Sequence, residues 1–97
     1  MNREAVSARL REHHATLERL DVKSLALFGS LARGEVGPES DVDLLVEFSQ
    51  PVGLFEFIRL KQALEQILER EVDLVTPDAL RESMRAEILE EAVDVTP

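Results

Sequence analysis

Apolar residues recur at helical spacing in three stretches of the chain. In the first stretch these residues are Val6, Leu10, Leu17 and Leu20. A repeat near 3.6 residues places such positions on one side of a helix, where they can pack against a core. The pattern predicts helices over Arg3–Leu20, Gly53–Glu69 and Asp78–Ala92. We expect Asp78 to be the N-cap of the last helix, because a short acidic side chain can accept a backbone N–H there.

Three shorter stretches carry strand patterns. Residues Lys23–Phe28 form a mostly apolar run that ends at a glycine, as a short buried strand does. Residues Asp41–Phe48 alternate, which places Asp41 and Asp43 on the face opposite the main apolar side chains. The third strand is expected over Glu71–Val75. Strands interleaved with helices predict an α/β (α+β) fold, a small mixed β-sheet of about three strands with helices packed against it.

Composition limits what this fold can hold. The chain has 97 residues, of which 44% are hydrophobic and 32% charged, so we expect one globular domain over residues 1–97 without a separate substrate-binding domain. The absence of cysteine excludes disulfides and thiolate metal sites. The first fourteen residues lack the apolar segment of a signal peptide, and no apolar run approaches transmembrane length. We therefore expect a cytoplasmic protein that does not associate with a membrane.

The formal net charge of −9 indicates which classes of molecule this protein can bind. Proteins that bind DNA or RNA use Lys and Arg to neutralise phosphates, so we expect no direct contact with nucleic acid. An anionic nucleotide can still bind an acidic protein if metal ions lie between them. The acidity also suits a protein partner with a basic face. The sequence leaves the oligomeric state open, including a homo-oligomer.

A candidate phosphate-binding turn follows the first predicted strand at Gly29-Ser30. Glycine lets a phosphate approach the backbone, and free N–H groups at the start of a helical turn attract anions. Ser30 adds a hydroxyl donor, and Arg33 lies one turn further on. Two interpretations of Arg33 stay open: a contact with a phosphate oxygen, or a surface ion pair with Glu35 or Glu39.

Candidate metal ligands lie on the second and third predicted strands. Asp41 and Asp43 point to the same face because they are two residues apart, and Asp73 lies between two apolar residues of the later strand. Acidic residues are mostly solvated, so each alone would suit an ordinary surface position. Two like charges held side by side favour a cation between them, and oxygen ligands favour Mg²⁺ or Mn²⁺. If the strands are neighbours, three carboxylates converge beside the Gly29-Ser30 turn.

This combination resembles a known superfamily. Gly29-Ser30, ten intervening residues, Asp41-x-Asp43 and a lone Asp73 on a later strand are similar to the nucleotidyltransferases that include DNA polymerase beta. The fuller run resembles the minimal nucleotidyltransferase (MNT) branch, and its further matching positions are Ala32, Arg33, Gly34, Ser40 and Leu44. The resemblance covers nearly the whole chain and implies the nucleotidyltransferase fold.

The resemblance also implies roles for these residues. Gly29 and Ser30 would hold the β- and γ-phosphates of ATP or another nucleoside triphosphate. Asp41 and Asp43 would hold two Mg²⁺ ions, with Mn²⁺ as an alternative. Asp73 would complete one metal site and help to deprotonate the attacking hydroxyl while pyrophosphate leaves.

MNT proteins commonly occur with a HEPN-domain ribonuclease toxin, for which they act as the antitoxin. The resemblance implies that AMP from ATP is transferred to a tyrosine hydroxyl of that toxin. This chain contains no tyrosine, so a tyrosine acceptor lies on another protein. The alternative hypothesis is a non-catalytic antitoxin that neutralises its partner by direct binding.

Overall fold

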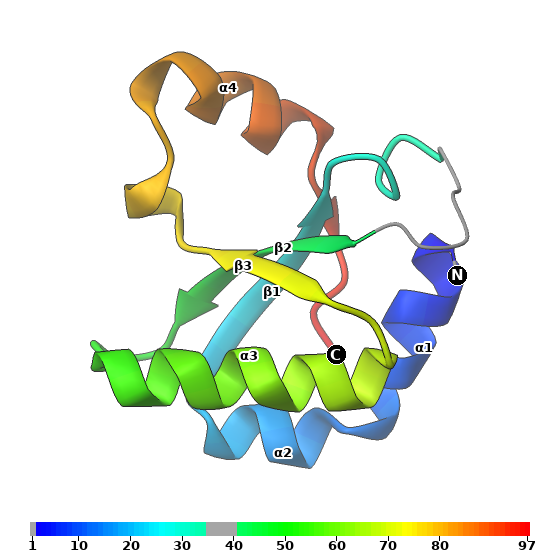
Figure 1. Ribbon diagram of the computed structural model, residues 1–97, viewed down its shortest axis with the longest axis vertical. Helices are drawn as coiled ribbons and strands as arrows, with labels where there is room; N and C mark the ends of the chain where they lie inside the picture. The colour runs from blue at the N-terminus through cyan, green and yellow to red at the C-terminus, as the bar shows by residue number, and fades with distance from the viewer. Residues whose placement is uncertain (1, 35–40) are drawn as a thin grey trace.

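The computed structural model describes residues 2–34 and 41–97. Its centre is a four-stranded mixed sheet in the order β3-β2-β1-β4 (Figure 1). The strands are β1 (Val22–Phe28), β2 (Val42–Phe48), β3 (Val72–Val75) and β4 (Val93–Asp94). Strand β1 is antiparallel to both β2 and β4, whereas β2 and β3 are parallel. The mixed α and β class is confirmed, and the parallel pair determines where the predicted ligands meet.

The fourth strand was not expected, because the pattern predicted about three. Strand β4 has only two residues, too few to show alternation, and follows directly on the last helix. It is defined by its pairing with the middle of β1, in which Leu27 faces Val93. The backbone N–H of Val95 extends this contact by donating to the carbonyl of Leu25 at 2.9 Å. Long-range pairing of this kind leaves no local sequence signal.

Helices cover the two faces of the sheet unequally (Figure 1). Three helices, α1, α2 and α3, lie together on one side, and α4 lies on the other. Their bounds are α1 Arg3–Glu12, α2 His14–Arg19, α3 Leu54–Leu68 and α4 Glu82–Glu91. None of the helices in the described ranges is long and apolar enough to cross a membrane.

Two helix boundaries differ from the prediction. The helix expected over Arg3–Leu20 breaks at His13, where the backbone N–H donates to Leu10 and the ring Nδ1 lies 3.0 Å from the carbonyl of Arg9. The His13 ring nitrogen thus lies close to a helical carbonyl at the residue where the two helices separate. The expected N-cap at Asp78 was also wrong, because Asp78 lies inside the 3-10 turn Pro77–Ala79 and α4 begins only at Glu82.

The hydrophobic core lies between the sheet and the three-helix side. Helices α1, α2 and α3 contribute Val6, Leu10, Leu17, Leu60, Leu64 and Leu68, all almost fully buried. The sheet contributes Leu25, Leu27, Val42, Leu44 and Val46. Because alternate residues of a strand point to opposite faces, this packing directs the intervening residues of β1 and β2 toward the α4 side. The core therefore determines which face of the sheet carries the polar side chains.

Candidate active site

The carboxylates predicted as metal ligands meet at one end of the parallel strand pair. Asp43 on β2 and Asp73 on β3 are register partners, and Asp41 directly precedes β2. Paired residues of neighbouring strands project from the same face of a sheet. For Asp43 and Asp73 this is the face opposite the core, because Val42 and Leu44 are buried on the core side. Asp43 is half-buried, whereas Asp41 and Asp73 are exposed. The structure thus brings all three side chains to one edge of the polar face.

The electrostatics of this group centre on Asp43. Partial burial raises the pKa of the Asp43 carboxyl above its ordinary value, and the nearby charges of Asp73 and Asp41 raise it further. Arg33 acts in the opposite direction and lowers the pKa, while Glu91 adds a smaller rise. A carboxylate that resists ionisation among like charges gains most from a bound cation. The site therefore favours a cation beside Asp43.

The carboxylates at this edge are candidate ligands for Mg²⁺. Within residues 2–34 and 41–97, no group of three His, Cys, Asp or Glu side chains is arranged to hold a metal ion by itself. Mg²⁺ usually binds through one or two carboxylates and takes its remaining ligands from water and substrate phosphates. The adjacent pair Asp43 and Asp73 supplies oxygen ligands of that number and kind. The donor set therefore fits a magnesium ion that binds together with a nucleotide.

Gly29 lies directly against the carboxylates. It is the first residue after β1 and has a φ of +77°, a backbone conformation that residues with a side chain rarely adopt. A Cβ atom placed on Gly29 would overlap Oδ2 of Asp43 and lie 3.0 Å from its Cγ. The turn that sequence analysis assigned to phosphate thus adjoins the predicted metal ligand, and only glycine fits between them.

The residues after Gly29 form one compact turn. The backbone N–H of Arg33 donates to the carbonyl of Gly29 at 3.2 Å, and that of Gly34 donates to Leu31 at 3.2 Å. Leu31 and Ala32 are buried and anchor the turn on the core, whereas Ser30 is half-buried. The structure therefore holds Gly29, Ser30 and Arg33 together beside Asp43.

Arg33 is paired with a residue that the sequence did not single out. Its Nη1 lies 3.3 Å from Oε1 of Glu91 and 3.4 Å from Oε2, at the end of α4. The expected partners Glu35 and Glu39 lie outside the described residues. Sequence analysis missed Glu91 because it is one of several glutamates of the last helix, which resemble a solvated face. No sequence motif includes both Glu91 and the turn at Gly29, so their contact is seen only in the folded structure.

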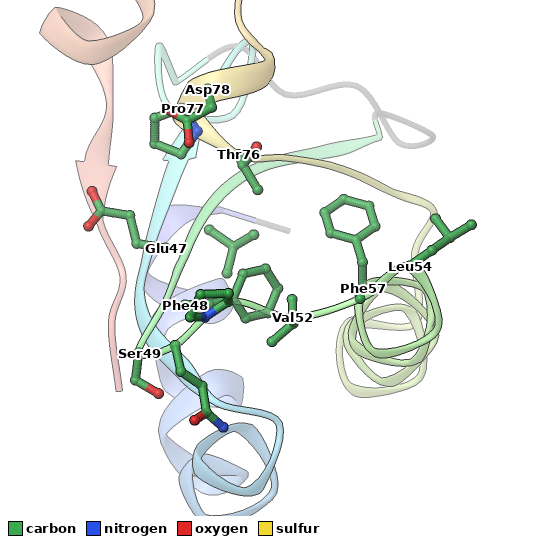
Figure 2. A pocket seen from close by; sticks show the side chains of 13 residues that line it. Glu47, Phe48, Ser49, Val52, Leu54, Phe57, Thr76, Pro77 and Asp78 are labelled. Carbon is green, nitrogen blue, oxygen red and sulfur yellow. The ribbon is translucent and has the colours of Figure 1, made fainter.

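A groove in the described part of the chain lies apart from these carboxylates (Figure 2). It is a groove of about 830 Å³ between the end of β2, the start of α3 and the segment after β3. Phe48, Val52 and Phe57 form its apolar wall, and the two phenyl rings lie 6.4 Å apart. None of the predicted site residues lines it. The sheet edge that carries the three carboxylates is therefore a better candidate for the active site than this groove.

Replacing Asp43 by asparagine is expected to stabilise the metal-free protein at neutral pH. A raised folded-state pKa means that ionisation of Asp43 costs stability as pH rises from about 3.8 through the folded value. The Asp43→Asn protein avoids that cost, so its melting temperature should exceed that of the wild type at pH 7 but not at about pH 3. Thermal unfolding in EDTA at both pH values measures this difference.

Asp94 provides a control of opposite sign. Hydrogen bonds from the side chain and backbone of Thr96 lower the pKa of the Asp94 carboxyl. Its contribution is present above the ordinary pKa and is lost as pH falls, so Asp94→Asn should lower the melting temperature at pH 7. Equal effects of the two substitutions would contradict the electrostatic account of Asp43.

Known proteins resemble this chain over most of its length. Residues 9–95 match the nucleotidyltransferase domain family. A protein adenylyltransferase, MntA, of Thermococcus cleftensis is 39% identical over 93 residues, which cover 95% of this chain and 94% of that protein. A solved structure described provisionally as a minimal nucleotidyltransferase superposes with a TM-score of 0.80 at 38% identity, covering 96% of this chain and 95% of that one.

A more distant likeness concerns the fold alone. A chain from a complex of a tri-AMPylated HEPN toxin with an MNT antitoxin of Shewanella oneidensis superposes with a TM-score of 0.58. The two chains are 18% identical, and the match covers 88% of this chain and 70% of that one. At this identity the shared feature is the arrangement of helices and strands.

Proposed function

Because this chain belongs to the nucleotidyltransferase domain family, we propose that it transfers AMP from ATP, with Mg²⁺, to a tyrosine hydroxyl of a HEPN-type toxin. The transfer neutralises the toxin, so the chain acts as its antitoxin. The observation that carries the proposal is the pairing of Asp43 with Asp73 in neighbouring parallel strands, together with the contact of the Asp43 carboxylate with Gly29. In nucleotidyl transfer, metal-holding carboxylates must lie beside the phosphate-binding turn.

Each residue of the site has a part in the proposed reaction. Gly29 offers its backbone, and Ser30 and Arg33 offer side-chain donors to the triphosphate, on a turn that the core holds in place. Asp41, Asp43 and Asp73 would hold the metal, which when bound would polarise the α-phosphate and neutralise the charge of the leaving group. The acceptor oxygen forms a bond to the α-phosphorus, and the bond to pyrophosphate breaks. Asp73, exposed at the sheet edge, takes the proton of the hydroxyl.

Two comparisons support a protein acceptor. Because the chain contains no tyrosine, a tyrosine acceptor would lie on another molecule. The relative from Thermococcus cleftensis is named a protein adenylyltransferase. The structure from Shewanella oneidensis contains a HEPN toxin that carries AMP. Together they favour a toxin as the acceptor over a small molecule.

A second candidate function is neutralisation by contact alone. Large apolar side chains are exposed on the first turns of α3: Leu54 by 70%, Phe55 by 80% and Ile58 by 40%. Contiguous apolar surface of this kind is typical of protein interfaces. Such a surface would let the chain bind and mask a partner without any transfer.

The experiment that tests the proposal combines the purified protein with a HEPN-type toxin, ATP and Mg²⁺, followed by intact-mass analysis. We expect the toxin to gain AMP units, and the Asp41→Asn/Asp43→Asn protein to transfer none. Asp78→Asn combined with Glu47→Gln removes the same charge from exposed positions outside the site and serves as the matched control.

The outcomes separate the two candidates. Transfer at the wild-type rate by the Asp41→Asn/Asp43→Asn protein would show that these residues are not the catalytic ones. If no nucleotide is transferred but both proteins still form a stable complex with the toxin and suppress it, contact alone explains neutralisation.

A further inference from the structure

The proposed phosphate-binding turn, which contains Gly29 and Arg33, is in contact with a carboxylate of the same chain. Glu91, the last residue of α4, accepts the backbone N–H of Gly29 through Oε1 at 3.2 Å. The same oxygen lies 3.3 Å from Nη1 of Arg33, and Oε2 lies 3.4 Å from it. A backbone N–H and a guanidinium are the donors that phosphate binding requires. The carboxylate of Glu91 thus takes the place of a phosphate oxygen between them.

Electrostatic repulsion between Glu91 and the neighbouring carboxylates disfavours this position of Glu91. The negative charge of Glu91 raises the pKa of the Asp43 carboxyl, as the charges of Asp41 and Asp73 also do. Only 31% of its side chain is exposed, so water screens this repulsion incompletely. The contacts with Gly29 and Arg33 therefore hold a fourth carboxylate at an edge that is already acidic. A stronger anion that arrives with its own cations would compete well for the same donors.

The helix that carries Glu91 is weakly attached. Ile88 is the one buried residue of α4, and Met84 and Leu89 are about half exposed. At the opposite end of α4, Arg85 donates to the carbonyl of Pro77 at 3.0 Å. Segments with few buried apolar contacts open at low free-energy cost. The pairing of Val93 with Leu27 holds the backbone just after α4 on the sheet, so release of Glu91 from Gly29 and Arg33 requires movement of its side chain and not of the core.

We propose that Glu91 is an internal competitor of the nucleotide: its carboxylate occupies the triphosphate position at Gly29 and Arg33, and nucleotide binding displaces it. The inference rests on the proposed nucleotide site. The competitor lowers the apparent affinity for nucleotide, because each binding event must break the contacts of Glu91. A residue that merely positions Arg33 for the phosphate would have the opposite effect, since its removal would weaken binding.

The test measures binding of an α,β-methylene analogue of ATP, which cannot release pyrophosphate, by titration calorimetry with Mg²⁺. We expect Glu91→Gln to bind the analogue about 3- to 10-fold more tightly than the wild type, the scale of a partly exposed charged contact. Glu90→Gln, an exposed neighbour on the same helix, removes the same charge and should leave the dissociation constant unchanged. Glu91→Asp keeps the charge but shortens the side chain, and it should bind with intermediate affinity.

A second measurement follows the contact directly. The amide resonance of Gly29 in a ¹⁵N-labelled wild-type sample should shift on addition of the analogue and should already be displaced in Glu91→Gln without it. Unchanged or weaker binding by Glu91→Gln, with normal binding by the wild type, would overturn the competitor role and leave the proposed function intact. Absence of analogue binding in wild type and all variants would overturn both the nucleotide site and the competitor.

Discussion

Gly29→Ala is expected to destabilise the protein by about 2 to 4 kcal/mol and to abolish nucleotide transfer. The new Cβ would overlap Oδ2 of Asp43, and alanine would also have to adopt the positive φ of +77°. Relief requires movement of either the turn or the Asp43 carboxylate, and each movement separates the phosphate-binding backbone from the metal ligand. Urea unfolding followed by far-UV circular dichroism measures the stability, because the chain has neither tryptophan nor tyrosine for fluorescence.

Gly34 provides a matched control for this substitution. Its φ is +79°, almost that of Gly29, but among residues 2–34 and 41–97 no atom other than those of Gly34 and its chain neighbours lies within 4 Å of an added Cβ. Gly34→Ala should therefore show the backbone cost alone, about 1 kcal/mol. Removing the obstructing carboxylate in Gly29→Ala/Asp43→Ala should recover the remainder of the lost stability without recovering activity. Equal destabilisation by the two glycine substitutions would contradict the steric account.

Asp73→Asn is expected to slow AMP transfer by about 10²- to 10⁴-fold, the contribution typical of a positioned proton acceptor. Asparagine keeps the shape of the side chain but neither accepts the proton of the attacking hydroxyl nor balances the charge of a metal. Asp73 is exposed, so the substitution should leave the free energy of unfolding nearly unchanged. The measurement is the initial rate of AMP incorporation into the toxin at saturating ATP and Mg²⁺.

Glu71 is the control for Asp73, since it is an exposed acid two residues earlier. Glu71 lines the same hollow as Asp41 and Asp73 but has no part in the proposed reaction, so Glu71→Gln should transfer AMP within about twofold of the wild type. A rate for Asp73→Asn close to that of Glu71→Gln would remove Asp73 from the catalytic residues. The proton would then have to leave through Asp41 or Asp43 instead.

Local pattern was sufficient to predict the face on which the carboxylates lie. Alternation along Asp41–Phe48 placed Asp43 opposite the buried valines and leucines, and burial of Val42 and Leu44 agrees with it. The pairing of Asp43 with Asp73 depends on strand order and register, which no single stretch encodes. Sequence reasoning had to assume that the two strands are neighbours.

Other features escaped prediction because they arise from contacts between distant residues. Strand β4 exists through its pairing with Leu27 and Ala26, about seventy positions away. The contact of Glu91 with Gly29 spans a similar distance. The break at His13 is local, but the apolar residues keep their helical spacing on both sides of it, so the apolar pattern alone does not reveal the break.

The parallel register of β2 and β3 links correct folding to activity. Val72 and Leu74 are buried on one face of β3, and Asp73 points from the other. A slip of β3 by one residue would turn Asp73 into the core and expose both apolar neighbours. Every misregistered molecule would therefore be inactive and also marked by exposed apolar surface, which proteases and chaperones recognise. The population that survives in a cell is thus enriched for chains whose carboxylates are correctly aligned.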